Sequence, residues 1–178
     1  KAGFYVDVGA HHPMRFSNTY LFYKIGWRGI NIEAMPGSMK LFKRFRPRDI
    51  NLEESVYSEN KSMPYYIFND SALNSFDRRL SEERNRLYGN YHVVKTIDLK
   101  TKRLSQILDE YLPKDQEIDF LNIDTEGLDM EVLKSNDWER YCPKVVLAEI
   151  FKNSLSAIES SDAALFLKSC GYMVHVKA

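Results

Sequence analysis

Three scarcities in the sequence each exclude a class of protein. Only two cysteines occur in 178 residues, Cys142 and Cys170, and they lack the spacing of metal ligands, so we expect reduced thiols and a cytoplasmic protein. Basic residues number 25 and acidic residues 25, a balance that leaves no field to attract nucleic acid or an anionic membrane. No apolar run reaches the length of a membrane span, so we expect none.

Glycine is also sparse, and the first strand-like stretch lacks the fingerprint of a dinucleotide site. After Gly9 that fingerprint requires glycine at two positions where this chain has His11 and Met14. The missing glycines argue against a pyrophosphate-bearing ligand. They therefore disfavour one alternative, a nucleotide-sugar-modifying enzyme, and favour a smaller ligand.

The stretch Phe4–Pro13 has the pattern of a buried parallel strand that ends in a tight loop beneath a ligand. Gly9 has no Cβ, which permits a sharp turn and lets a ligand approach the backbone. Asp7 supplies an acceptor carboxylate at the same strand end, and a helix is predicted over 20–25. Strand, glycine loop and helix in this order form half of an open α/β ligand site.

A second buried strand, Ile30–Glu33, also ends in an acid. Glu33 lies 26 residues after Asp7, close to where a nucleoside-binding α/β unit places a carboxylate for ribose hydroxyls. A carboxylate suits this role because it accepts two hydrogen bonds from a vicinal diol. A third strand is predicted over 49–56, and we expect its end, Glu54 and Ser55, to lie beside the first two strand ends and contact an adenine ring.

The region between these strands and the next is rich in charge. A helix that opens at Pro36 carries basic residues that we interpret as a solvated face, with a phosphate-bearing substrate as the alternative: Lys40, Lys43, Arg44, Arg46 and Arg48. Segment 69–91 is polar and of mixed sign. It is interpreted either as a solvated helix or loop, or as an inserted cap that recognises an acceptor substrate. Thr101 is predicted to cap the following helix.

Acidic residues gather again at the ends of two later strands. Ile118–Gly127 contains a buried strand with Asp124 and Glu126 at its carboxyl end, and a further strand over 144–150 carries Glu149. Ligands of open α/β sheets bind outside the carboxyl ends of the strands. We therefore expect these acids to lie near the first two strand ends.

Strands and helices alternate along the whole chain, which predicts a single α/β domain over 1–178. Such alternation favours a mostly parallel sheet with helices on both faces. The chain enters a strand almost at once and stops within a strand-like run over 172–176. We interpret these abrupt ends as those of a trimmed fragment.

Three motifs together resemble the FkbM-type methyltransferases: Val6–Pro13, Gly26–Glu33 and Ile123–Gly127. The resemblance implies a Rossmann-like class I methyltransferase fold with a seven-stranded sheet whose last strand is antiparallel. It also implies S-adenosyl-L-methionine (SAM) as cofactor and O-methylation of hydroxyls on a sugar, glycan or natural product. The expected partner is thus a small-molecule or glycan acceptor.

The resemblance places cofactor-binding residues at strand ends and at the start of the first helix. Those implied around the methionine half and the carboxylate of SAM are Asp7, Gly9, Ala10, His11, Ser17, Asn18 and Thr19. Glu33 would hold the ribose, and Asp124 and Glu126 would lie beside the reacting centre. Many relatives carry Asn-Xaa-Gly where this chain has His11-His12-Pro13.

A hydroxyl nucleophile is weak until a base takes its proton, so a base near the methyl group is expected. Asp124 is the first choice, His11 and Glu149 are the second, and Glu126 organises the loop. Asp7 and His12 are also metal-ligand types, but no tight ligand spacing supports a metal, and none is expected. The rival from another class is a non-catalytic SAM- or nucleotide-binding module that acts on a partner through segment 69–91.

Overall fold

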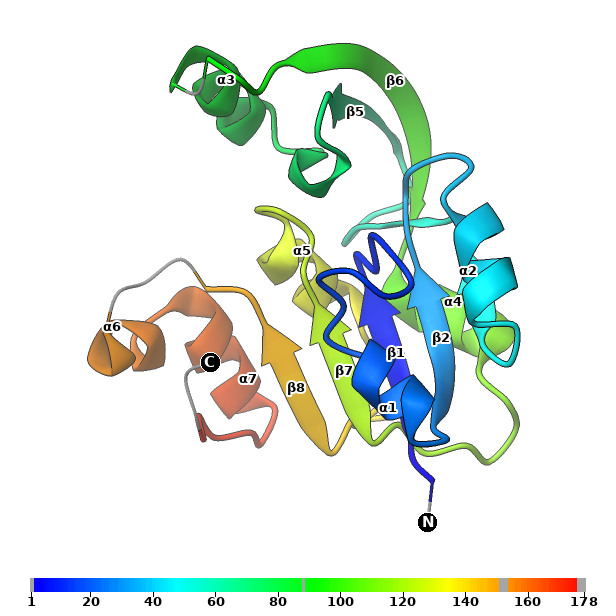
Figure 1. Ribbon diagram of the computed structural model, residues 1–178. Coiled ribbons are helices and arrows are strands. Elements are labelled where there is room, and N and C mark those ends of the chain that lie inside the picture. The colour runs from blue at the N-terminus through cyan, green and yellow to red at the C-terminus, as the bar shows by residue number, and fades with distance from the viewer. Residues whose placement is uncertain (1, 88, 151–153, 176–178) are drawn as a thin grey trace.

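The centre of the protein is a five-stranded parallel sheet, found in a computed structural model that describes residues 2–87, 89–150 and 154–175 (Figure 1). In spatial order its strands are β3 (Ile50–Leu52), β2 (Arg28–Ile32), β1 (Phe4–Val8), β7 (Phe120–Ile123) and β8 (Val145–Ala148). All four neighbouring pairs are parallel. Every residue of the central strand β1 is buried, as its apolar sequence predicts.

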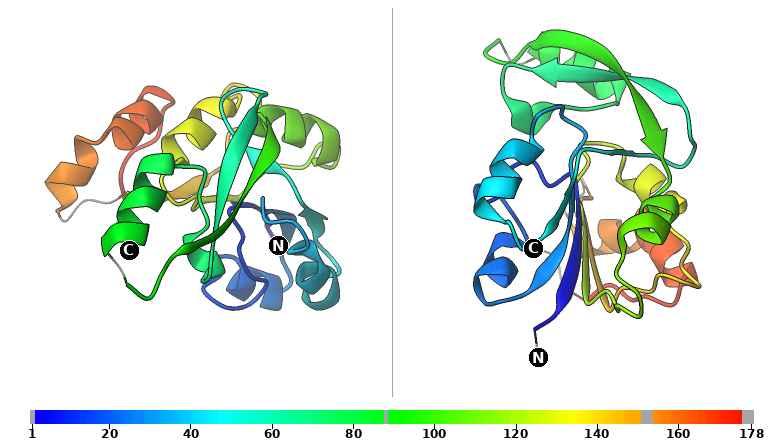
Figure 2. Two further views of the ribbon diagram at one scale, coloured as in Figure 1. Left: turned by 90° about the horizontal axis from the view of Figure 1, so that it is seen from above. Right: turned by 90° about the vertical axis from the view of Figure 1, so that its right-hand side faces the viewer.

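Helices cover both faces of this sheet (Figure 2). On one face lie α1 (Tyr20–Lys24) and α2 (Met39–Phe45). On the other lie α4 (Leu104–Tyr111), α5 (Asp129–Ser135) and α7 (Asp162–Ser169), the last preceded by the short α6 (Leu155–Glu159). The predicted Rossmann-like α/β fold is confirmed. Among the described residues no helix combines the length and apolarity that crossing a bilayer requires.

Residues 55–102 leave this framework and return to it, and we refer to them as the insert. The insert contains β4 (Ser55–Val56), β5 (Ser62–Phe68), the 3-10 turn η1 (Ser71–Leu73), α3 (Arg78–Leu87) and β6 (Val93–Lys102). Strands β5 and β6 form a long antiparallel pair, and β4 pairs in parallel with the end of β6. The insert stands beyond the carboxyl ends of the parallel strands (Figure 1).

Several local predictions are wrong. The strand predicted over 49–56 is split between β3 of the main sheet and β4 of the insert. Thr101 lies within β6, where its hydroxyl donates to the Glu59 carbonyl at 2.7 Å, and helix α4 begins after Arg103. The helix expected to open at Pro36 begins at Met39, three residues later.

The carboxyl-terminal part of the sheet also differs from expectation. Residues 172–175 form no strand, and Val176 of the predicted last strand lies outside the described residues. The parallel sheet of the described chain has five strands rather than the seven that the resemblance implies.

Candidate functional site

A pocket lies where the carboxyl ends of the parallel strands meet the underside of the insert. Residues after β1, β2 and β7 line one side of it: Gly9, Ala10, His11, Glu33, Asp124 and Glu126. The other side is lined by Glu54, which directly precedes the insert, and by residues of the insert: Val56 at its base, and Tyr65, Asn74, Ser75 and Phe76 above. The strand-end acids predicted from the sequence therefore converge on one site.

Gly9 allows two of these loops to touch. Its backbone has φ +80°, and a Cβ at this position would lie 1.8 Å from the carbonyl oxygen of Asp124. Any side chain would therefore push the loop after β1 away from the loop after β7. The same residue donates its N–H to Ile32 O at 3.0 Å, which fixes the loop against β2 as well.

Glu33 is buried at the end of β2 and accepts hydrogen bonds on both carboxylate oxygens. The backbone N–H of His11 donates to Oε2 and that of Met35 to Oε1, each at 2.9 Å. The Tyr65 hydroxyl, which belongs to the insert, lies 3.5 Å from Oε1. A carboxylate offers about four lone-pair positions, so acceptor capacity remains for ligand hydroxyls in the pocket.

Asp7 is fully enclosed and bonded within the protein. Its carboxylate accepts from the Thr19 hydroxyl at 2.5 Å and from the Asn122 amide at 2.8 Å, and that amide's oxygen accepts from Asn18 at 3.1 Å. Burial raises the pKa of Asp7, while the Thr19 and Asn122 bonds and Arg46 lower it; the net direction is upward. Asp7 thus holds the strand end and the start of α1 together.

Arg46 contradicts the prediction of a solvated basic face. Its side chain is completely buried, although neighbouring residues of the same helix are exposed. The guanidinium donates to Pro13 O at 2.7 Å, Ser17 Oγ at 2.6 Å, Thr19 Oγ1 at 2.8 Å and Asn31 Oδ1 at 3.0 Å. Arg46 therefore clamps the loop between β1 and α1 from behind.

Four residues predicted to bind the cofactor differ in whether they reach the pocket. Ser17 and Asn18 line the pocket, whereas Thr19 is buried behind it and its hydroxyl does not cap α1. Ser55 is buried and points away from the pocket, because alternation along β4 turns its neighbours Glu54 and Val56 toward it. Of the predicted strand end, Glu54 lines the pocket and Ser55 does not, so the expected adenine contact stays a prediction for Glu54 alone.

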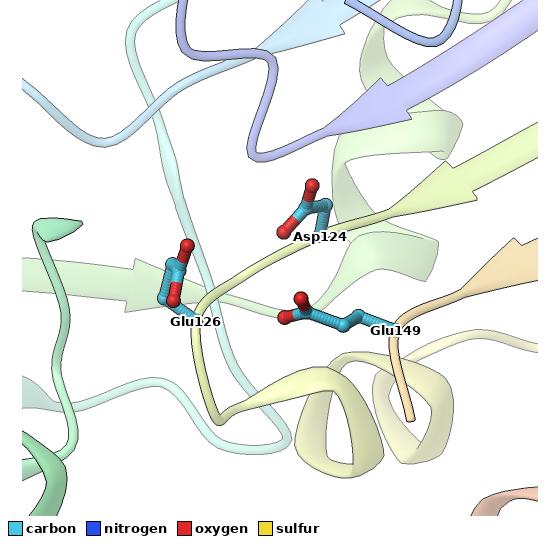
Figure 3. A group of neighbouring side chains, drawn as sticks. All are labelled: Asp124, Glu126 and Glu149. Atoms are coloured by element: carbon cyan, nitrogen blue, oxygen red, sulfur yellow. The ribbon is translucent and has the colours of Figure 1, made fainter. Parts of the chain in front are cut away.

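Asp124, Glu126 and Glu149 form an acidic cluster after β7 and β8 (Figure 3). One carboxylate oxygen from each lies within 4.8 Å of the others. Burial first, then the nearby Glu126 and other acids, raise the pKa of Asp124 to about 6. Burial and Asp124 likewise raise the pKa of Glu149 to about 7, and Glu149 Oε2 is buried without a hydrogen-bond partner among the described residues. The cluster can hold and exchange protons near neutral pH.

The insert is tied to this cluster through Glu126. Arg84 of α3 forms a charged hydrogen bond with the Glu126 carboxylate, and the Ser75 hydroxyl donates to Glu126 O at 2.8 Å. Glu126 itself adopts φ +51°, a conformation few non-glycine residues take. Two residues within segment 69–91, Ser75 and Arg84, thus contact the loop after β7.

The residue set considered for a metal is not brought together. That set comprised Asp7, His11, His12, Asp124 and Glu126. Only Asp124 and Glu126 of these lie in a cluster of possible ligands, and the third member of that cluster is Glu149. His12 Nδ1 instead accepts from the backbone N–H groups of Met14 and Arg15 at 3.1 and 3.0 Å. His12 therefore organises its own loop.

Sequence reasoning missed three residues of the site: Arg46, Tyr65 and Arg84. Arg46 had a local signal, since it follows the buried Met39 and Phe42 at helical spacing, although it lies just past the end of α2. Tyr65 and Arg84 had none, because the insert's position over the pocket depends on pairing between residues far apart in the chain.

An open parallel sheet with an acid-lined pocket beyond its strand ends defines a Rossmann-like α/β ligand-binding domain. Comparison with protein families narrows this class, because the model of the methyltransferase FkbM domain matches residues 7–174. The chain belongs to this family and is a methyltransferase domain, as the three sequence motifs indicate. No curated protein and no solved structure matches the chain.

Proposed function

We propose that the domain transfers a methyl group from SAM to a hydroxyl of a small-molecule or glycan acceptor. The observation that carries this proposal is Glu33, a buried carboxylate beside the glycine loop that keeps acceptor capacity toward the pocket. Its place at the end of β2 suits the vicinal diol of a ribose. SAM, when bound, supplies an electrophilic methyl group on a sulfonium.

The residues that would hold this cofactor lie on the sheet side of the pocket. Gly9, Ala10 and His11 form the backbone wall, and Ser17 and Asn18 lie at the approach to α1. A Cβ at Gly9 would meet the carbonyl oxygen of Asp124, so glycine at this position keeps the loops after β1 and β7 together on this side of the pocket. The Glu33 and Asp124 carboxylates are hydrogen-bond acceptors, and they suit a ligand that carries hydroxyl or ammonium donors.

Asp124 is the proposed base. The Asp124 carboxylate would accept the proton of the acceptor hydroxyl, which would make that oxygen a better nucleophile toward the methyl group. The Asp124 pKa of about 6 keeps the group ionised at neutral pH while making it more basic than an ordinary aspartate. Glu149, within the same cluster, is positioned to take the proton onward.

The insert is the proposed acceptor cap. Its segment 71–76 lines the pocket opposite the sheet, and Arg84 joins it to the acidic cluster. Within a single domain, the sheet side would then bind the cofactor, and the part of segment 69–91 near the acidic cluster, which Arg84 joins to Glu126, would recognise the acceptor.

Calorimetric titration with SAM and with S-adenosylhomocysteine (SAH) tests the proposal. We expect micromolar binding by the wild-type chain and its loss in Glu33→Ala, with a thermal melt to check folding. Glu53→Ala is the matched control, because Glu53 is an exposed acid just past the end of β3. Labelled SAM with a panel of glycan and small-molecule acceptors then tests transfer. Binding without transfer to any hydroxyl acceptor would favour the non-catalytic alternative.

A further inference from the structure

The insert presents two polar side chains, Tyr65 and Asn74, to the pocket at the Glu33 end. Both are more than nine-tenths buried, with exposed fractions of 3% and 8%. Neither is needed to hold the sheet together, since both belong to the insert. Buried polar groups in native proteins normally have partners, so the bonds these two make and lack are informative.

Asn74 is held in one orientation and has an unused donor. Its Oδ1 accepts from the backbone N–H of Phe68 at 2.8 Å, which fixes the amide plane. Its Nδ2 is buried and makes no hydrogen bond of standard geometry among the described residues, although the amide is near enough to the Tyr65 hydroxyl to lower the pKa of that group. Leaving such a donor unpaired costs about 1–3 kcal/mol, so the group is explained best by a partner that binds there.

Tyr65 stands between Asn74 and the sheet. Its hydroxyl lies 3.5 Å from Glu33 Oε1, too long for a strong bond. Burial first, then Glu33, raise the pKa of this hydroxyl, while the adjacent Asn74 amide lowers it; the net direction is upward. The Tyr65 ring packs against Phe76 with centroids 4.6 Å apart, and this contact fixes where the hydroxyl points.

We propose that Tyr65 and Asn74 form the second wall of the nucleoside subsite and hydrogen-bond the ribose or adenine from the side opposite Glu33. Two donors on the insert then face one acceptor on the sheet, which matches a ligand that carries both hydroxyl and ring-nitrogen acceptors. The inference rests on the proposed function, because it names further residues that contact the same cofactor.

Calorimetry with two probes tests this assignment: SAH, and 5′-deoxy-5′-methylthioadenosine, which lacks the amino-acid end. Tyr65→Phe removes only the hydroxyl. Asn74→Asp keeps the oxygen that bonds Phe68 N and replaces the donor. We expect each variant to weaken both probes by roughly threefold to tenfold. The matched controls are Tyr66→Phe, on the opposite face of β5, and Asn69→Asp, which bonds outside the pocket; neither should change affinity.

The outcomes separate the inference from the proposed function. Wild-type affinity in both Tyr65→Phe and Asn74→Asp, with SAH still bound, would overturn the inference alone. A folded wild-type chain that binds neither probe would overturn both. If Asn74→Asp fails to fold, Tyr65→Phe still decides, because it keeps every other contact of the ring.

Discussion

Arg84 and Glu126 join the insert to the acidic cluster. The two side chains are 12% and 23% exposed, so the charged hydrogen bond between them is largely shielded from solvent. Glu126 comes from the loop after β7, and Arg84 from a helix more than forty residues earlier in the chain. This bond therefore holds α3 beside the loop after β7 and also offsets one negative charge of the acidic cluster.

Removing this link should weaken acceptor binding. Arg84→Ala leaves the Glu126 carboxylate without its cation and frees α3 to move away from the pocket. We expect the acceptor KM to rise about tenfold, in keeping with loss of a partly buried charged bond, while SAH affinity stays within about twofold. Steady-state kinetics and calorimetry measure the two effects.

Arg78→Ala is the control for this change. Arg78 lies on the same helix and pairs with Glu82, but both side chains are mostly exposed, and such pairs contribute little. An equal rise in KM for both variants would mean that the helix, rather than the Arg84–Glu126 bond, sets acceptor affinity.

Asp124→Asn should remove the base and leave cofactor binding intact. We expect turnover to fall by about 10²–10⁴-fold, the usual contribution of a general base, with SAH affinity within a few-fold. In the wild type the base must be ionised, so the rate should rise with pH through about 6 and then level. Unchanged turnover in Asp124→Asn, or a flat pH profile in the wild-type enzyme, would exclude Asp124 as the base.

The ionised Glu149 side chain should lower the free energy of unfolding at pH 8. Its pKa is raised from 4.5 to about 7, so the folded state retains a proton that the unfolded chain has already released. The associated stability is fully present below pH 4.5 and is lost as pH rises to about 7. After allowance for partial exposure, we expect the free energy of unfolding of Glu149→Gln to be about 1 kcal/mol higher than that of the wild type at pH 8.

The gain from Glu149→Gln should vanish at pH 4, where the wild-type carboxyl is protonated in both states. Denaturant titrations at the two pH values measure it. Glu139→Gln, at an exposed position, should show no such pH dependence. A gain of equal size at both pH values would contradict the electrostatic explanation.

Arg46→Lys should be strongly destabilising although it keeps the charge. A lysine has one nitrogen and cannot reach the four acceptors that the guanidinium fork serves. We expect the free energy of unfolding to fall by about 2–4 kcal/mol, because buried acceptors lose their partners. Arg44→Lys, on the exposed side of the same helix, should change it by less than about 0.5 kcal/mol. Urea denaturation distinguishes the two.

The parallel sheet and its acidic strand ends could be predicted because their signals are local. Apolar runs that end in Asp7, Glu33 and Asp124 mark buried strands, and parallel strands bring their carboxyl ends to one edge. Gly9 could be placed by the same reasoning. The close approach of the Asp124 carbonyl to Gly9 could not be predicted, because that contact joins residues far apart in the sequence.

The base of the insert and Arg46 were predicted wrongly, for different reasons. Strand predictions near Ser55 failed because the chain changes sheets between Leu52 and Ser55, and a shift of one residue reverses which side chains face the pocket. Arg46 was misassigned because charge on a helix usually means solvent, a rule that fails where several hydrogen-bond acceptors enclose the site.

The base of the insert has a consequence for how this domain can be altered. Ser55 pairs with Thr101 and Val56 with Lys102, so the chain leaves the framework and rejoins it at adjacent points. A unit closed on itself in this way can be lengthened, shortened or exchanged for another without changing the register of the parallel sheet. Grafting at this one junction can therefore replace the insert while the strands and strand-end acids of the parallel sheet stay as they are.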